Sequence, residues 1–331
     1  MTEAKSERPS ALEEFKREFA NIWKSIPYKG VFVLLLVPWV LLFEFVGNST
    51  FGYLKSHSLY AWMFWDYLSN PDDEHGMYIP FVVLALFWWK REDFRNLKTA
   101  PWLPGLLLIL VAVTMHVVGY LIQQTRISIA AFFFGLYALI GLVWGLSALR
   151  ASFFPMCLLA FALPLGTIAE TITLPLRLFA TTVTGAISQS VLGIEVIYKG
   201  TMIFNPSGAF QYEVAAACGG LRSLTAILAL CTIFAFVNFK RHRNRFLLIT
   251  AGIPLAILAN MTRLLGLIII SEAFGQEIGM KAHDSTWFSL LPYVPAIVGV
   301  VLLGHWLRER SDNSDVESPM IQNTSQLQAT P

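Results

Sequence analysis

Residues 213–245 read EVAAACGGLRSLTAILALCTIFAFVNFKRHRNR, and this stretch decides the class of the fold. Between Gly220 and Phe239 the residues are mostly apolar, and a basic cluster begins at Lys240. An α-helix needs about 20 mostly apolar residues to cross a bilayer. The stretch therefore predicts a transmembrane helix at residues 219–239, with Cys218 just before its first residue.

The composition extends this prediction to the whole chain. Of 331 residues, 55% are hydrophobic and only 14% are charged, whereas a soluble globular protein has about 25% charged residues. The chain therefore has too little charge to cover a surface that faces water. It shows no basic, aromatic-rich surface, no glycine-rich phosphate loop and no metal-ligand spacing, so no nucleic acid, cofactor or metal is expected.

The apolar runs predict an all-α polytopic membrane protein with about eight transmembrane helices. The clusters of lysine and arginine fall in alternate connections and near both ends of the chain, so all of them lie on one side. Basic clusters mark the cytoplasmic side, which places both termini in the cytoplasm. The expected spans are residues 30–47, 77–92, 102–123, 127–149, 152–170, 219–239, 246–272 and 290–307.

Three regions follow from this topology. Residues 1–29 are polar, with aromatic residues at helical spacing, which indicates a cytoplasmic amphipathic N-terminus on the membrane surface. Residues 30–307 form the membrane domain, and residues 308–331 are expected to be a disordered cytoplasmic tail.

The longest extracytoplasmic segment is expected at about residues 171–218. Its first part reads as a small helix. Its second part alternates apolar and polar residues around Lys199-Gly200 and Asn205-Pro206-Ser207-Gly208, which predicts short strands joined by turns. A small β ribbon therefore precedes Cys218.

Cys218 is the first candidate for chemistry. It lies where a helix begins, and the free N–H groups of a helix N-terminus stabilise a thiolate or an oxyanion. Gly219 and Gly220 leave room for a substrate backbone. Arg222 lies one turn further on the same face, where it would bind a substrate carboxylate or a lipid headgroup.

Arg263 is the second candidate, because it lies inside the expected span 246–272 and Asn260 shares its face of the helix. A charged residue within a span usually serves a function and faces protein or a water-filled cavity. The alternative is that Arg263 extends to the outer headgroups. Arg222 competes with Arg263 for the role of the cation at the site.

Two histidines compete for the role of general base. His283 lies in the last extracytoplasmic segment and His75 lies in the first, so each would face the same side as Cys218. A thiol, a histidine and a fixed arginine at one membrane surface indicate cysteine-based acyl transfer. Glu213 would either bind a cation of the site or end the ribbon.

Three sequence blocks, YEVAAACGGLRSL, ANMTRLLGL and KAHDSTWF, resemble the signature blocks of the exosortase/archaeosortase family of membrane cysteine protease-transpeptidases. The resemblance continues in VLGIEVIYKGTMI and in the pairs Trp65-Asp66 and His75-Gly76, so it covers nearly the whole chain. It implies that Cys218, Arg263 and His283 are catalytic.

The chain also departs from the family pattern near two of these residues. Ala216 and Gly219 flank Cys218, where the family often has glutamate and serine. Asp284 follows the histidine, where the family often has glutamate. These changes lie beside the three proposed catalytic residues, so they bear on the sub-family and on the recognised motif.

The resemblance implies that the partners are exported proteins with a C-terminal sorting signal. In the family this signal is a short motif of the Pro-Glu-Pro type (PEP-CTERM), then a transmembrane helix and a basic cluster. The enzyme would cut near the motif and pass the protein, through a thioester, to an envelope or extracellular acceptor such as a polysaccharide or lipid. The expected location is the cytoplasmic membrane, with the active site on the extracytoplasmic side.

A second function remains open from the residues alone. A non-enzymatic membrane transporter or scaffold would use Arg263 and Asn260 to line a permeation route, and Cys218 would then be incidental. Such a route would also need polar residues in the cytoplasmic halves of the spans, and few are present there.

Overall fold

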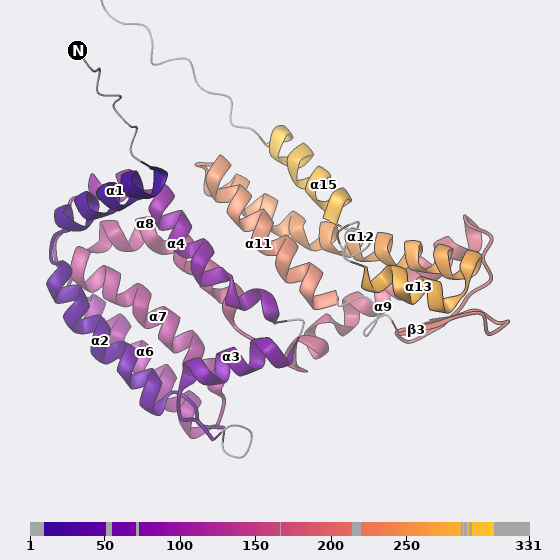
Figure 1. The fold of residues 1–331 in the computed structure, drawn as a ribbon, viewed down its shortest axis with the longest axis horizontal. Coiled ribbons are helices and arrows are strands. Elements are labelled where there is room, and N and C mark those ends of the chain that lie inside the picture. The colour runs from indigo at the N-terminus through magenta and orange to yellow at the C-terminus, as the bar shows by residue number, and fades with distance from the viewer. Residues whose placement is uncertain are drawn as a thin grey trace, which may run out of the picture.

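The structure is a computed structural model that describes residues 10–50, 55–70, 73–165, 167–213, 220–285, 287, 290 and 293–307 (Figure 1). Most of these residues are helical, which confirms the predicted mainly helical fold. The helices are α1 (Ala11–Ser25), α2 (Lys29–Val46), α3 (Leu59–Ser69), η1 (Glu74–Met77), α4 (Ile79–Trp89), α5 (Arg91–Arg95), α6 (Gly105–Leu121), α7 (Thr125–Trp144), α8 (Leu146–Cys157), η2 (Leu158–Ala162), α9 (Thr167–Ser190), α11 (Gly220–Asn238), α12 (His242–Phe274), α13 (Gln276–Asp284) and α15 (Tyr293–Trp306).

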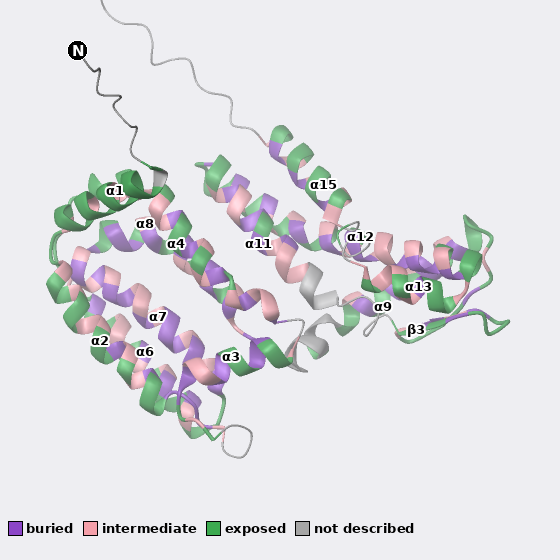
Figure 2. Cartoon of the chain, in the orientation of Figure 1, coloured by how far each residue is buried: buried purple, intermediate pink, exposed green. Residues whose placement is uncertain are grey.

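The apolar helices fit a protein embedded in a membrane. Three of the described helices, α2, α7 and α12, are long and apolar enough to cross a bilayer, and several shorter helices are also apolar. Figure 2 shows many exposed residues on α2, α6 and α15, and these include Leu34, Leu107 and Leu302. Apolar side chains on outer faces suit contact with lipid tails. The expected spans lie largely in helices, but the end of the fourth (127–149) is wrong: α7 ends at Trp144, and Gly145, with a φ of 95°, separates it from α8. The count of eight and the orientation stay predictions.

The fifth span differs from its predicted range of 152–170. Helix α8 begins at Leu146, continues as η2 and ends at Ala162, so the apolar segment starts six residues earlier. The chain is not helical at Leu163–Leu165, where Pro164 lacks a backbone N–H and restricts the residue before it. A new helix, α9, then begins at Thr167.

The predicted amphipathic N-terminus contains helix α1. Its N-cap is Ser10, whose hydroxyl accepts from the N–H of Glu13 while the Glu13 carboxylate accepts from the N–H of Ser10. This reciprocal pair satisfies two backbone donors at the start of the helix. Phe15 packs on Trp88 at the end of α4. The placement of α1 on a membrane surface stays a prediction.

The predicted β ribbon is a three-stranded antiparallel sheet of β1 (Ile197–Lys199), β2 (Met202–Phe204) and β3 (Gln211–Glu213). Gly200 has a φ of 63° in the first turn, a conformation that favours glycine. Asn205 shapes the second turn by accepting from the N–H of Ser207, and its amide donates to Glu272 of α12. The sheet is therefore tied to the helix that carries Arg263.

The same side of α12 buries the inner face of the sheet. A small hydrophobic core joins residues of the strands and their flanks with residues of α12, namely Val196, Ile203, Phe210, Tyr212, Leu264, Leu267 and Ile268. Figure 1 shows the sheet and α13 toward one end of the molecule, whereas α1 lies toward the other. The sheet thus supports the part of α12 around Arg263.

Side chains of the N-terminal half hold the segment that leads into α9. Asp73 accepts from the backbone N–H of Leu165 at 3.0 Å, and Arg126 donates to the carbonyl of Pro164 at 2.7 Å. The hydroxyl of Tyr67 donates to the carbonyl of Ala162. These three bonds satisfy backbone groups that the break between η2 and α9 leaves without helical partners.

Asp66 lies beside this cluster, on α3, with only 3% of its surface exposed. Burial, and to a smaller degree the negative charge of Asp73, raises the pKa of its carboxyl above the ordinary value of 3.8, although the amide of Asn70 donates to it and opposes the shift. The folded chain therefore binds this proton more tightly than the unfolded chain. Stability should fall as the pH rises from 3.8 through the higher folded pKa.

Asp66→Asn should remove this pH dependence, because asparagine keeps the shape of the side chain and has no charge. We expect the melting temperature of the detergent-solubilised variant at neutral pH to equal or exceed that of the parent protein. Asp93→Asn on the exposed face of α5 is the matched control, and it should change neither quantity. A melting temperature that drops at pH 7 more than at pH 4 would show that the ionised carboxylate stabilises the fold.

Candidate functional site

Two of the three predicted catalytic residues lie in contact. Nη2 of Arg263, on α12, is 3.0 Å from Nε2 of His283, on α13. Nδ1 of the same histidine is 3.0 Å from Oδ1 of Asp284. Arg263, His283 and Asp284 therefore form a continuous chain of polar contacts.

The hydrogen-bonding chemistry of Arg263 assigns the tautomer of the His283 imidazole. A guanidinium donates hydrogen bonds and accepts none, so Nε2 of His283 is the acceptor and carries no proton. Nδ1 then carries the ring proton and donates it to Asp284. The imidazole is neutral in this arrangement, and its basic nitrogen points at Arg263.

Two glycines bring His283 to Arg263. Gly275 ends α12 and begins α13 with a φ of 85°, a backbone conformation that side chains disfavour. The chain therefore turns back, and α13 packs along α12. Gly279 faces Ser271 of α12 so closely that a Cβ at this position would overlap the Ser271 hydroxyl.

The sheet fixes the same corner from the other side. The hydroxyl oxygens of Tyr212 and Ser271 lie 2.6 Å apart, and the side chain of Gln276 donates to the carbonyl of Gln211. Strand β3, helix α12 and the first turn of α13 are thus joined by side-chain hydrogen bonds. This network holds the hairpin that presents His283.

The exposure of the three polar side chains differs in a way that matters for chemistry. The His283 side chain is 13% exposed, whereas that of Asp284 is 72% exposed. Water therefore screens the contact between them, and Asp284 acts on the ring by orienting it through the hydrogen bond. Arg263 has a buried Nε that finds no hydrogen-bond partner among the described residues.

Asn260 lies one turn before Arg263 on α12, as predicted, and it is buried. Its Oδ1 also has no hydrogen-bond partner within the described part of the chain. Buried polar atoms usually have partners, so two such atoms on one helix face indicate a place where a ligand supplies them. This is the strongest local sign of a binding site on α12.

The remaining predicted residues are placed in part. Glu213 is the last residue of β3 and is exposed. Cys218 lies in the stretch 214–219, outside the described residues, and of Arg222 only its place in the first turns of α11 is described. Both flanking elements, β3 and α11, pack against α12. The position of the thiol relative to His283 therefore stays a prediction.

His75, the rival base, belongs to a different part of the molecule. It lies in η1, which packs on α3, α4 and η2 in the N-terminal half. His283 is instead in polar contact with Arg263 and Asp284. Of the two histidines, the structure brings His283 to the arginine, whereas His75 stays a candidate for substrate binding.

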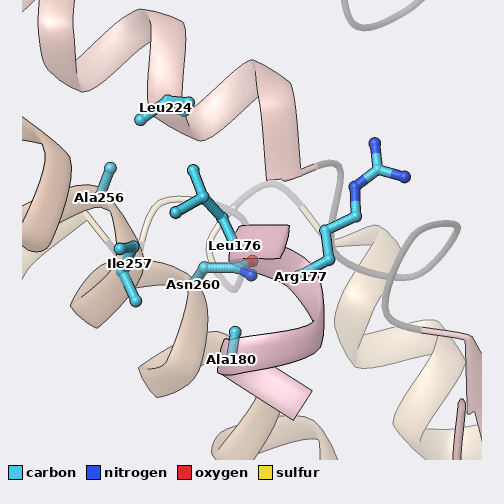
Figure 3. Close-up of a pocket in the computed structure, with 7 residues that line it drawn as sticks. All are labelled: Leu176, Arg177, Ala180, Leu224, Ala256, Ile257 and Asn260. Atoms are coloured by element: carbon cyan, nitrogen blue, oxygen red, sulfur yellow. The ribbon is translucent and has the colours of Figure 1, made fainter. Parts of the chain in front are cut away.

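A small pocket, with room for about one water-sized group, lies where α9, α11 and α12 meet (Figure 3). Its wall is mainly apolar, and its lining residues are Leu176, Arg177, Ala180, Leu224, Ala256, Ile257 and Asn260. Reasoning from the sequence overlooked Arg177. The signal was available in LPLRLFATTVTGAISQS, where polar residues recur at helical spacing inside an otherwise apolar segment.

No cluster of three or more His, Cys, Asp or Glu residues with the geometry of a metal site occurs within the described ranges. The polar groups of this site are the Arg263 cation, the neutral imidazole of His283, the Asp284 carboxylate and the Asn260 amide, and an arginine next to a site disfavours a bound metal cation. Acid–base and electrostatic chemistry is what these groups supply.

Comparison with protein families gives a match over most of the chain. A family model described as transmembrane exosortase (Exosortase_EpsH) matches residues 62–291, which is more than half of the chain. The matched range contains η1, the sheet, α11, α12 and α13, and with them every site residue considered above. Comparisons with curated proteins and with solved structures give no significant match.

Proposed function

Because the chain belongs to the transmembrane exosortase family, we propose that it is a membrane-embedded cysteine protease-transpeptidase. Its substrates are exported proteins that end in a sorting signal, with a short motif of the Pro-Glu-Pro type, a transmembrane helix and a basic cluster. The observation that carries the proposal is the contact between Arg263 and His283, backed by Asp284. These are the cation and the base that thiol-based acyl transfer requires.

The first step forms a thioester and releases the C-terminal segment. The sulfur of Cys218 attacks the scissile carbonyl carbon, and its proton passes to Nε2 of His283. The C–N bond then breaks, and the imidazolium gives that proton to the leaving amine. Asp284 accepts from Nδ1 throughout, which keeps the ring in the productive orientation.

Arg263 has two partners in succession. Without substrate it donates to Nε2 of His283, which occupies the basic nitrogen. When a substrate carbonyl binds, the guanidinium turns to its oxygen and stabilises the negative charge that develops there. This exchange frees Nε2 to receive the thiol proton, so the base becomes available only when an acyl group is present.

The second step consumes the thioester. An amine or a hydroxyl of an envelope acceptor attacks the acyl carbon and gives its proton to His283. The C–S bond then breaks, and the imidazolium returns the proton to the sulfur of Cys218. With water in the same position the product is a free carboxylate, and the reaction is proteolysis. The site faces the extracytoplasmic side of the cytoplasmic membrane in this proposal, because exported substrates present their motif there.

Co-expression of the chain with an exported reporter that carries the three-part signal tests the proposal. We expect a shortened reporter on immunoblots, with its new C-terminus near the motif as determined by mass spectrometry. A reporter whose motif residues are replaced by alanine, with the span and basic cluster kept, should stay intact and serves as the control. An intact first reporter, in cells that contain the folded chain in their membranes, would contradict the proposal and favour the non-enzymatic transporter or scaffold.

A further inference from the structure

One face of α9 carries a row of buried polar side chains. Arg177, Thr181, Thr184 and Ser188 follow one another at intervals of three or four residues, which places them on one side of the helix. All four are buried. A buried stripe of this kind is unusual in a helix whose other positions are largely apolar, since buried polar groups need partners.

Most of this row has no hydrogen-bond partner in the part of the chain that the structure describes. Thr181 bonds back to the carbonyl of Arg177 at 2.8 Å. The hydroxyl oxygens of Thr184 and Ser188, and Nε of Arg177, have no hydrogen-bond partner among the described residues. The row therefore offers donors that this chain leaves unused within its described part.

Arg177 is the charged member of the row, and its buried guanidinium needs an anionic partner. Only 7% of its surface is exposed, and no described carboxylate lies within ion-pair distance of it. Removing a guanidinium from water without an anion is unfavourable, and a buried arginine near a membrane normally has a partner. A lone buried arginine is thus suited to an anion that arrives with a ligand.

The residues around Arg177 indicate the chemistry of the ligand that would bind it. Figure 3 shows Leu176 and Ala180 facing Ile257 and Asn260 across the pocket, while the guanidinium of Arg177 extends away from them. A ligand here would place one small apolar group in the pocket and an acidic group on Arg177. Asn260 lies three residues before Arg263, so the same ligand lies one helical turn from the Arg263–His283 pair.

We infer that Arg177 is a specificity-determining residue, which binds a carboxylate of the substrate's C-terminal segment and so positions the adjoining peptide bond at the Arg263–His283 pair. This inference rests on the proposed function, because it takes the ligand to be the protein substrate. A peptide carboxylate is favoured over a lipid phosphate because Arg177 lies inside a junction of three helices, next to a pocket that also holds polar atoms of α12.

The test compares two substrates whose C-terminal segments, here called substrate tails, differ in one side chain. One tail carries a single glutamate on the extracytoplasmic side of its span, and the other carries glutamine at that position. We expect the purified protein in vesicles of neutral lipid to cleave the glutamate tail with a kcat/KM about 10- to 100-fold higher than the glutamine tail. This comparison needs no change to the protein, so misfolding cannot imitate the result.

Arg177→Gln should remove the preference. It should lower kcat/KM for the glutamate tail to the level of the glutamine tail and leave the glutamine tail nearly unchanged, whereas Arg177→Lys should keep part of the preference. Lys199→Gln is the matched control, because it removes an exposed positive charge of β1 and should alter neither tail. Equal losses on both tails would overturn the inference.

Two further outcomes separate the inference from its premise and from lipid binding. If the parent protein cleaves neither tail, the proposed function fails, and fluorescence anisotropy of labelled tails then tests Arg177 directly. Tighter binding of the glutamate tail that Arg177→Gln abolishes would support the inference, and equal binding would overturn it. A loss in Arg177→Gln that appears only in vesicles with anionic lipid, and equally on both tails, would assign Arg177 to a headgroup instead.

Discussion

Cys218→Ala should abolish processing of the reporter, with a loss of at least about 1,000-fold, because no other group forms the acyl intermediate. Removing the sulfur deletes the nucleophile but keeps a small residue next to Gly219. The variant should reach the membrane in normal amounts and melt at the same temperature as the parent protein. Densitometry of the shortened reporter over time measures the effect.

Cys157→Ala is the matched control for this change, because the same substitution is made at a cysteine that lies in α8 and is exposed. It should leave the rate unchanged. Processing that continues in Cys218→Ala at the parent rate would assign the reaction to another nucleophile and remove the thiol from the mechanism.

Arg263→Gln should lower kcat by about 100- to 1,000-fold, since one well-placed oxyanion donor contributes this much to a rate. Glutamine keeps a donor of shorter reach, but it loses the charge that faces the developing oxyanion. Arg263→Lys should recover only a small part of the rate, because an ammonium group lacks the planar fork that bonds His283 and the carbonyl oxygen in turn.

Thr262→Ala is the control for the arginine variants. Its hydroxyl bonds back to the carbonyl of Leu258, so the substitution tests α12 itself without touching the site. A change in KM with kcat preserved in Arg263→Gln would contradict the oxyanion role, and it would instead place Arg263 among the groups that bind substrate in the ground state.

The sheet and the apolar helices could be predicted because their signals are local. The turn residues Gly200 and Asn205–Gly208 stand between short alternating runs, and the structure has strands on each side of both turns. Apolar length likewise locates α2 and α12. The end of the fifth span could not be read in this way, because the apolar run continues past Pro164 and only the backbone restriction of proline ends the helix.

The pairing of Arg263 with His283 is predicted from the membrane side on which both are expected, from their chemistry and from the family resemblance. Its physical cause lies in tertiary structure. Helix α13 is short and polar, so its periodicity carries little signal, and its position depends on the turn at Gly275 and the close approach at Gly279. Arg177 was overlooked for a related reason. In a sequence, a single arginine in an apolar helix indicates a side chain that extends to the membrane–water interface, and only the packing shows that Arg177 is buried.

The central claim is that this arginine–histidine pair serves a thiol that carries the acyl group. Rapid quenching of the purified protein with the reporter, followed by mass spectrometry, tests it most directly. The account predicts a covalent adduct of the N-terminal part of the reporter on the peptide that contains Cys218, released by hydroxylamine as a hydroxamate. Cleavage of the reporter with no adduct at Cys218 and no hydroxamate would contradict the account.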